Sequence, residues 1–273
     1  MTLTSTAGAM SISDATFDKV RKLIYEKAGI SLNDNKRMLV YGRLTPLARR
    51  QGLGSIEELL DKVGRNADLQ QQFINALTTN LTSFFREAHH FEMLGDALRS
   101  SRGKVRIWCA AASTGEEPYS IALCCKENLP AASQVEIIAT DIDTTVLSKA
   151  KAGIYPEASV ASVPTAMRKR WFTQRNELGK SMMAVNDQVK SMVRFQQLNL
   201  VAGSWALTPG FDFIFCRNVL IYFDQQTKTG ILRKMHSMLK PGGTLYVGHS
   251  EHFRDELDLF RSAGRTSYVR IER

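Results

Sequence analysis

The chain has 273 residues, 44% of them apolar, and a formal net charge of +9. That length and apolar fraction can bury a substantial core in one large domain or two modest ones, which argues against a disordered protein. No stretch approaches the roughly 18 unbroken apolar residues of a membrane span, and Met1–Ser13 lacks the basic and apolar regions of a secretion signal. We therefore expect a cytoplasmic protein without membrane insertion.

The positive charge favours an acidic partner, which can be nucleic acid, an anionic membrane surface or an acidic protein. The chain has no run of five or six consecutive basic residues and no aromatic-interleaved RNA-binding motif, so we expect no nucleic acid partner. Neither its four cysteines nor its five histidines have the spacing of C-x-x-C or H-E-x-x-H sites. We therefore expect no metal.

The first part of the chain, to about Arg86, has the pattern of a small helical bundle. Apolar residues recur at helical spacing from Phe17 to Ala28, and Gly29 follows as a stop, which predicts a helix over about 13–28.

Three more helices are expected in this part. Asn35–Arg50 carries five basic residues and no acidic one, so its helix presents a face of one charge sign. Ser55 and Glu58 have the spacing of a capping box before a short helix that ends near Gly64. A further helix is predicted over 67–79.

From Lys104 onward, strands and helices alternate. Strands are predicted over 105–110, 135–140, 193–198, 211–216, 244–248 and 266–271, and helices over 117–127, 145–152 and 225–239. This alternation predicts an α/β fold with a doubly wound, mostly parallel sheet and helices on both faces. A ligand should then bind at the carboxyl ends of the strands.

The alternation breaks between Pro164 and Val193, where a short helix near 164–172 leads into a small antiparallel β insert at about 173–195. We therefore expect an N-terminal helical domain over 1–86, an ordered linker over 87–103 and a sheet domain over 104–273.

The first strand of the sheet domain runs into a turn of small residues, Ala110–Gly115, at the start of a helix. Such a turn lets the backbone approach a ligand. It lacks the G-x-G-x-x-G pattern, and Glu116 and Glu117 would place negative charge where a pyrophosphate should bind. The turn therefore suits a cationic ligand without phosphate.

Polar residues also follow other predicted strands. Asp141 ends the second strand, where a carboxylate can accept hydrogen bonds from both ribose hydroxyls; alternatively, Asp141 or Asp143 caps the next helix. Asn199 can bind an adenine edge through its amide or can form a turn.

The strand 211–216 ends in a polar pair, Arg217 and Asn218, which marks a candidate site. The alternative is that Arg217 pairs with a neighbouring carboxylate and Tyr222 packs in the core. Residues 77–87 leave the helical bundle with polar residues interrupting an apolar run, and such a loop can supply side chains to a cleft.

Five stretches carry these features over most of the chain: LTTNLTSFFREAHHF, IWCAAASTGEEPYSIA, ATDIDTTVLSKA, FDFIFCRNVLIYFD and LKPGGTLYVGHSE. Taken together and in this order, they resemble the CheR family of chemotaxis receptor methyltransferases, which are protein-glutamate O-methyltransferases. The resemblance implies a class I methyltransferase domain with a small β-subdomain insert, behind a small N-terminal helical domain. It also implies S-adenosylmethionine as cofactor and S-adenosylhomocysteine as product, with no metal.

The resemblance assigns roles to individual residues. Asp141 would hold the ribose, Asn199 and Leu200 the adenine neighbourhood, and Arg86 and Tyr222 would lie near the transferred methyl group. The full set of implied cofactor residues is Asn80, Thr82, Arg86, Glu117, Asp141, Asn199, Leu200, Arg217 and Asn218.

The implied acceptor is a glutamate on the acidic helical bundle of a cytoplasmic chemoreceptor. The basic helix 35–50 could dock on that bundle or be a solvated face. In some members of the family the β-subdomain also grips a peptide at the receptor C-terminus, but no motif over 173–195 identifies that site here. Two other functions stay open: a methyltransferase for another substrate, and a module that senses the cofactor without turnover.

Overall fold

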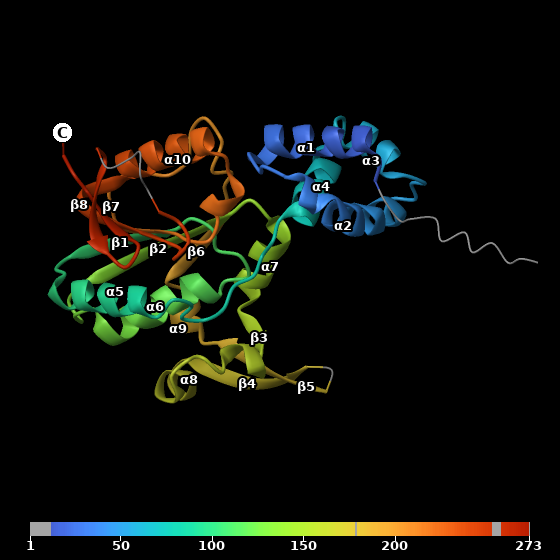
Figure 1. Cartoon of the computed structure of the whole chain (residues 1–273). Coiled ribbons are helices and arrows are strands. Elements are labelled where there is room, and N and C mark those ends of the chain that lie inside the picture. The colour runs from blue at the N-terminus through green and yellow to red at the C-terminus, as the bar shows by residue number, and fades with distance from the viewer. Residues whose placement is uncertain (1–11, 178, 253–257, 273) are drawn as a thin grey trace, which may run out of the picture. The chain divides into compact units, whose positions relative to one another are not determined.

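The computed structural model describes residues 12–177, 179–252 and 258–272 (Figure 1). Its internal contacts divide the chain into two compact units, Met1–Thr78 and Thr79–Arg273. This division falls before the boundary expected at Arg86, and the stretch expected as a linker contains a helix, His89–Ser100, of the second unit.

The first unit is all helical, as the sequence predicted. Its elements are α1 (Asp14–Ala28), the 3₁₀ turn η1 (Asp34–Lys36), α2 (Arg37–Arg50), α3 (Ile56–Val63) and α4 (Ala67–Leu77). Ser55 caps α3, since its Oγ accepts from the Glu58 amide at 3.1 Å, while the Glu58 carboxylate accepts from the Gly54 amide. Buried apolar residues such as Phe17 and Leu44 form the core of this unit.

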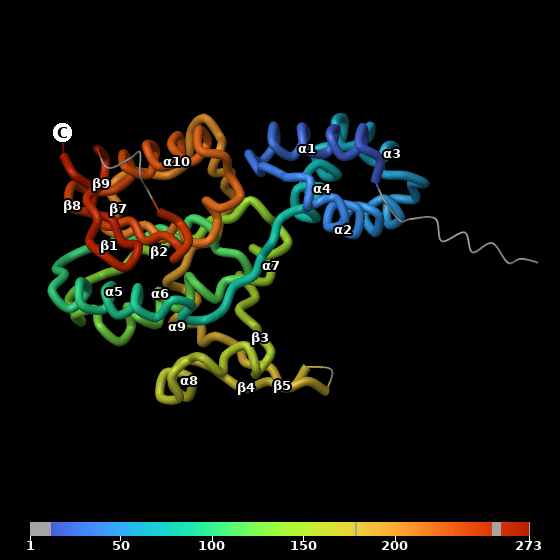
Figure 2. The backbone as a smooth tube through the Cα atoms, viewed as in Figure 1, coloured from blue at the N-terminus to red at the C-terminus, as the bar shows by residue number. Residues whose placement is uncertain are grey.

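The second unit is built on a seven-stranded sheet in the order β6-β2-β1-β7-β8-β10-β9. Its strands are β1 (Lys104–Cys109), β2 (Gln134–Asp141), β6 (Val193–Gln197), β7 (Phe211–Cys216), β8 (Leu239–Val247), β9 (Phe260–Gly264) and β10 (Ser267–Arg270). Five strands, from β6 to β8, pair in parallel, and β10 is antiparallel to both β8 and β9. The chain path in Figure 2 ends in this antiparallel edge.

Helices cover both faces of the sheet, as the alternation predicted (Figure 1). They are α5 (His89–Ser100), α6 (Glu116–Asn128), α7 (Thr144–Ala152) and α10 (Gln225–Met238). Successive strand residues point to opposite faces, so Ile107 packs with the α5 and α6 side chains, whereas Trp108 packs with those of α10. The sheet is therefore the middle layer of two hydrophobic cores.

A second, three-stranded antiparallel sheet is inserted in this unit, in the order β3-β5-β4. Its elements are β3 (Ile154–Pro156), η2 (Glu157–Val160), α8 (Thr165–Trp171), β4 (Phe172–Glu177) and β5 (Lys180–Val185), and α9 (Asp187–Lys190) follows. The insert thus begins earlier than the expected residue 173, and Val193–Gln197 is a parallel strand of the large sheet instead.

Within the described residues, no helix has both the length and the apolar character to cross a membrane.

Candidate active site

The carboxyl ends of the parallel strands lie side by side at one end of the large sheet, which we call the carboxyl edge. Along this edge Asn199 follows β6, Asp141 ends β2, the turn 110–115 follows β1, and Arg217 and Asn218 follow β7. Because neighbouring parallel strands end at the same edge, residues predicted from separate motifs lie in one row.

Asp141 holds the turn after β1 against the end of β2. Its Oδ2 accepts a hydrogen bond from the Ser113 amide at 2.8 Å, and its Oδ1 accepts from the Asp143 amide at 2.9 Å. Burial raises the pKa of Asp141, and these backbone hydrogen bonds oppose the rise. Each carboxylate oxygen has a further lone pair, so Asp141 can still accept hydrogen bonds from ligand hydroxyls.

Asn80 lies beside the same turn. Its Nδ2 donates to Asp143 Oδ2 at 2.8 Å, and its carbonyl accepts from Ser113 Oγ at 3.1 Å. Asp143 is also the N-cap of α7, since its Oδ1 accepts from the Thr145 amide at 2.8 Å. Asp143 is therefore the residue that caps α7, whereas Asp141 and Asn80 both contact Ser113 in the turn after β1.

Arg217 places a positive charge at this edge, and its side chain is fully buried. Its Nη1 lies 2.6 Å from Glu117 Oε2, and its Nη2 lies 3.3 Å from Glu87 Oε2. The second oxygen of Glu117 accepts from the Cys109 thiol at 3.2 Å. The expected alternative, that Arg217 pairs with neighbouring carboxylates, is thus confirmed. Two carboxylates against one guanidinium leave a net negative charge here.

Glu87 keeps its negative charge in this cluster. Burial alone would raise its pKa, but the Arg217 charge and the hydrogen bond from Asn218 outweigh burial, so the pKa of Glu87 lies below its usual value. Asn218 Nδ2 donates to Glu87 Oε1 at 3.4 Å, and the Asn218 amide donates to Glu251 Oε2 at 2.8 Å.

Arg86 and Thr82 lie on the segment before α5, and both are half-buried. The backbone carbonyl of Arg86 accepts a hydrogen bond from Arg217 Nη2, which ties this segment to the end of β7. The Arg86 guanidinium itself donates to the carbonyl of Leu81 at 3.1 Å. Tyr222 is half-buried in the 3₁₀ turn η3 (Leu220–Tyr222), so it is not a fully buried core residue.

Asn199 forms a turn after β6, because its Oδ1 accepts from the Val201 amide at 3.1 Å. Leu200 beside it is buried in the core under α10. Asn199 therefore forms the turn that the sequence offered as an alternative, and its contact with adenine stays a prediction.

Four non-glycine residues around this edge have a positive φ: Phe85 (52°), Glu87 (57°), Ser113 (47°) and Asn218 (56°). Such conformations cost free energy and persist where the surrounding contacts impose them, which is frequent at functional sites.

Comparison with known proteins identifies the chain. The family model described as CheR methyltransferase, SAM binding domain matches residues 80–269, and the one described as CheR methyltransferase, all-alpha domain matches residues 15–78. The chain belongs to the CheR methyltransferase family. It is similar to chemotaxis protein methyltransferase 2 of Pseudomonas aeruginosa, with 44% identity over 92% of this chain and 91% of that protein. It is also 44% identical to the Escherichia coli chemotaxis protein methyltransferase, over 95% of this chain and 92% of that protein.

The chain is therefore an S-adenosylmethionine-dependent methyltransferase, and its α/β sheet with a helical N-terminal unit is the predicted fold. The residues at the sheet edge fit this cofactor. Carboxylates outnumber the buried guanidinium, so the edge suits a cationic ligand, and Gly115 (φ 100°) starts α6 with no side chain in the turn.

One cluster in this CheR chain has a composition that can bind a metal ion. Ligand atoms of Glu87, His89 and His90 lie within 4.8 Å of one another. The Glu87 carboxylate is, however, already paired with the Arg217 guanidinium and lies next to its positive charge, which disfavours a second cation.

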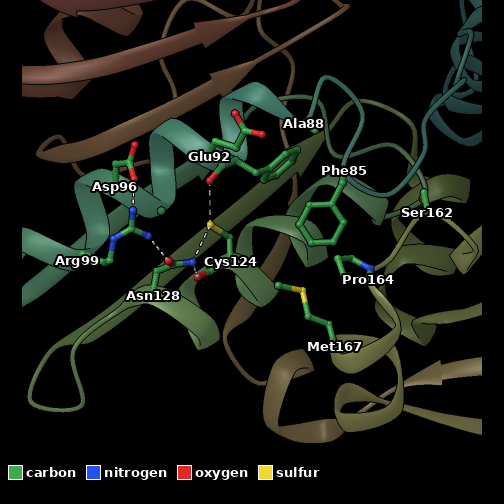
Figure 3. Close-up of a pocket in the computed structure, with 12 residues that line it drawn as sticks. Phe85, Ala88, Glu92, Asp96, Arg99, Cys124, Asn128, Ser162, Pro164 and Met167 are labelled. Atoms are coloured by element: carbon green, nitrogen blue, oxygen red, sulfur yellow. Dashed lines mark hydrogen bonds and ion pairs between the residues drawn. The ribbon is translucent and has the colours of Figure 1, made fainter.

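A cavity of about 410 Å³ opens elsewhere in this unit, between α5, α6 and the segment before α8 (Figure 3). Phe85, Pro164 and Met167 form its apolar side, while Arg99 on the opposite side donates to Asn128 at 2.6 Å. None of the predicted site residues lines it, so its volume does not mark the cofactor site.

Sequence reasoning missed Ser113, Glu87 and Glu251 as members of the site. Both glutamates stand inside motifs that carried the CheR resemblance: Glu87 is the second residue of REAHHF, and Glu251 is the last residue of VGHSE. The signal that could have found them is an acidic residue next to a polar strand end, but their partners lie far away in the sequence.

Proposed function

We propose that this CheR family chain transfers the methyl group of S-adenosylmethionine to glutamate side chains of cytoplasmic chemoreceptor helices. The products would be glutamate methyl esters and S-adenosylhomocysteine, and the reaction would serve adaptation in bacterial chemotaxis. The observation that carries the proposal is the match of nearly the whole chain to proteins named chemotaxis protein methyltransferases.

The chemistry needs little acid–base machinery. The acceptor glutamate is already ionised at neutral pH, since the usual pKa of its side chain is about 4.3. S-adenosylmethionine supplies, when bound, a methyl group activated by a sulfonium charge. The protein has to hold the acceptor oxygen in line with that methyl group and to exclude water.

The proposed cofactor residues are those that line the carboxyl edge and the segment before α5. Asp141 would accept from the ribose hydroxyls, because it is buried there with lone pairs to spare. Asn199 and Leu200 would border the adenine. The remaining contacts are assigned to Asn80, Thr82, Arg86, Glu117, Arg217 and Asn218.

Arg86 and Tyr222 are proposed to lie next to the reacting groups. The side chains of both are half-buried rather than enclosed in the core, which leaves them accessible to an incoming acceptor. Arg86 would orient a carboxylate, either of the acceptor glutamate or of the cofactor's methionine part, through its forked donors.

Two surfaces are proposed for the receptor. Arg49 and Arg50 of α2 and Lys36 of the preceding turn η1 are exposed, and they would face an acidic helical bundle; Arg37, by contrast, is paired with Asp14 at 2.6 Å. On the insert, β4 is an edge strand, and its residues 173–177 are exposed, so it could pair with an extended receptor peptide.

The test is transfer of label from methyl-labelled S-adenosylmethionine to the chemoreceptors of the host. We expect label that is released by mild base as methanol, because the product is an ester, and receptors whose acceptor glutamates are changed to alanine should take up none. Label stable to mild base would indicate a different acceptor group. Binding of S-adenosylhomocysteine without any transfer would indicate a sensor of the cofactor.

A further inference from the structure

Glu251 is a buried carboxylate that the sequence motifs and the proposed cofactor set leave without a role. The residue is 5% exposed, and in the part of the chain that the structure describes its carboxylate accepts hydrogen bonds from backbone amides. Its Oε2 accepts from the Gly248 amide at 2.6 Å and the Asn218 amide at 2.8 Å, and its Oε1 accepts from the Ile221 amide at 3.3 Å.

These three amides belong to two different loops. β7 and β8 are parallel neighbours, and their ladder ends with Cys216 opposite Val247. The ladder between the two strands does not continue beyond that pair. There the Glu251 carboxylate connects the loop after β7 with the loop after β8, because it accepts hydrogen bonds from amides of both. Charge-assisted hydrogen bonds of this kind are stronger than those between neutral groups.

The junction is also sterically tight. A Cβ atom added at Gly248 would lie 2.3 Å from Asn218 Nδ2 and 2.9 Å from Glu251 Oε2. Asn218 itself has a φ of 56°, a conformation that needs support from its surroundings. Only a glycine at 248 therefore allows Asn218 and Glu251 to approach each other this closely.

The junction leads directly to the candidate site. The Asn218 side chain donates to Glu87, Glu87 pairs with Arg217, and Arg217 pairs with Glu117. The same loop carries Tyr222, whose turn begins one residue before the Ile221 amide that Glu251 binds.

We propose that Glu251 is a positioning residue of the methyltransferase: it fixes the loop after β7 so that Asn218, Arg217 and Tyr222 face the cofactor and the acceptor. This inference depends on the proposed function only where kcat on receptors is measured, since cofactor binding and hydrogen exchange can be measured without an acceptor. Glu251 has no contact with the reacting groups in this scheme, and its effect passes through the backbone of residues 218–221.

The test compares Glu251→Gln with Asp212→Asn. Gln has the same shape, but it replaces one carboxylate oxygen with an NH₂ group. In either orientation of the side-chain amide, this NH₂ group would face at least one backbone N–H that a carboxylate oxygen now accepts from. Asp212 is the matched control at the opposite end of β7, where its Oδ2 accepts from the Arg106 amide at 2.8 Å and its Oδ1 from Lys240 at 2.6 Å. Both variants lose a carboxylate that binds a backbone amide, but only one lies at the carboxyl edge.

For Glu251→Gln we expect kcat on receptors to fall about tenfold or more, because small displacements of positioning groups are costly. Calorimetry should show weaker binding of S-adenosylhomocysteine, and amide hydrogen exchange at Asn218, Ile221 and Gly248 should speed up. Asp212→Asn should lose thermal stability but keep kcat and cofactor affinity within about twofold. Equal kcat and affinity in Glu251→Gln and the wild type, or equal losses in both variants, would overturn the proposal.

If Glu251→Gln does not fold, Gly248→Ala tests the same junction, because the added Cβ would force Asn218 and the Glu251 carboxylate apart while the carboxylate itself is kept. Wild-type kcat and affinity in a folded Gly248→Ala variant would also overturn the proposal. The calorimetry and the exchange need no acceptor. A wild type that methylates no receptor therefore refutes the proposed acceptor without hiding the result for Glu251.

Discussion

Arg86 and Arg217 lie close together but differ in what their guanidinium groups contact. Arg217 is fully buried between the carboxylates of Glu87 and Glu117, and its guanidinium forms ion pairs with both. The Arg86 guanidinium is half-buried and donates to the neutral carbonyl of Leu81, so its charge remains to attract a ligand carboxylate. At the scale of single residues, this difference predicts that Arg86 orients a carboxylate and that Arg217 meets the cofactor from a position fixed by its two ion pairs.

Arg86→Ala should lower turnover by at least about 100-fold, because positioning of the reacting groups supplies several kcal/mol of the rate enhancement. The measurement is methyl transfer to receptors at saturating cofactor, together with calorimetry of S-adenosylhomocysteine. Arg265→Ala, an exposed arginine at the β9–β10 turn, serves as the control. Near-normal turnover with normal cofactor binding would show that Arg86 does not have this role.

His90 is a buried residue whose protonation state is set by its surroundings. Its Nε2 lies 2.8 Å from the Arg265 carbonyl, which can only accept, so Nε2 carries the proton. Burial lowers the pKa of His90 to about 4, and the Arg217 charge adds to this shift. The imidazole is therefore neutral in the folded protein at neutral pH.

Because the pKa of His90 is lower in the folded state, the unfolded chain takes up the proton first as the pH falls. The neutral form of His90 therefore contributes fully to the free energy of unfolding above about pH 6.5. This contribution is lost as the pH falls toward about 4, and the loss amounts to at most about 3 kcal/mol. His90→Gln should lack this slope when unfolding by urea is measured between about pH 7.5 and pH 4.5. The exposed His249→Gln should keep it; the same slope in both variants would contradict the assignment.

At the scale of elements, the turn between β1 and α6 depends on a glycine. Gly115 has a φ of 100°, and a Cβ there would lie 2.7 Å from the Tyr155 hydroxyl and 2.9 Å from the Ala150 Cβ. The turn therefore packs directly on α7 and β3, and its shape is fixed by that contact.

Gly115→Ala should lower the free energy of unfolding by about 3 kcal/mol, the sum of a left-handed backbone penalty and overpacking. Gly103 gives the matched control, since it also has a positive φ (77°) but none of the described residues has an atom within 4 Å of an added Cβ. Gly103→Ala should cost only the backbone penalty of about 1 kcal/mol in the same urea titration. Equal costs would show that the contact with Tyr155 and Ala150 is not rigid.

Glu136 ties three strands of the large sheet together. Its carboxylate on β2 contacts Lys104 and Arg106 of β1 at 2.9 and 3.0 Å and Arg194 of β6 at 3.6 Å. The hydrogen bond from Lys104 lowers the pKa of Glu136, burial opposes the shift, and Arg106 adds to it.

A carboxylate with a lowered pKa stabilises the fold above the usual pKa of about 4.5 and loses that contribution as the pH falls below it. Glu136→Gln should therefore cost about 1 kcal/mol at neutral pH, and the difference from the wild type should vanish in acid. Thermal unfolding across this range measures it, with the exposed Glu157→Gln as control. A difference that persists in acid would mean that packing, not charge, is lost.

The sequence predicted the elements whose pattern is local and missed those that depend on partners. Helices α1 and α3 carry Ser13 and Ser55 as caps, and both were expected within a residue or two. Helix α5 lies inside the stretch expected as a linker, and β4 opens the expected antiparallel insert although its exposed, polar residues 173–177 carry no strand pattern of their own. β4 is a strand only through its pairing with β5.

At the scale of the whole molecule, the site also has a part that local sequence patterns predict and a part that depends on distant partners. Motifs at strand ends predicted Asp141, Arg217 and Asn218, because parallel topology brings such ends to one edge. The charge network could not be predicted, since Arg217 and Glu87 are 130 positions apart in the chain and no periodicity connects the two. The resemblance to the CheR family supplied the segment before α5 that the strand pattern alone omits.

Several contacts attach that segment to the sheet unit. Asn80 binds Asp143, the Phe85 amide donates to Ser120 Oγ at 2.9 Å, and Ser162 Oγ donates to the Phe84 carbonyl at 3.0 Å. Helix α5 adds buried apolar side chains to the core on one face of the sheet. All of these contacts lie within Thr79–Arg273, so this unit contains the whole candidate cofactor site.

Two fragments test where the cofactor-binding unit begins. A fragment of residues 79–273 should fold and bind S-adenosylhomocysteine within about threefold of the full chain, because it keeps every proposed cofactor residue. A fragment of residues 104–273 should lose binding, since it lacks Asn80, Arg86 and the apolar face of α5. On receptors, the longer fragment should raise KM, as the basic α2 surface is gone. Retained binding by the shorter fragment would refute the role proposed for the segment before α5, and an unchanged KM would refute docking through α2.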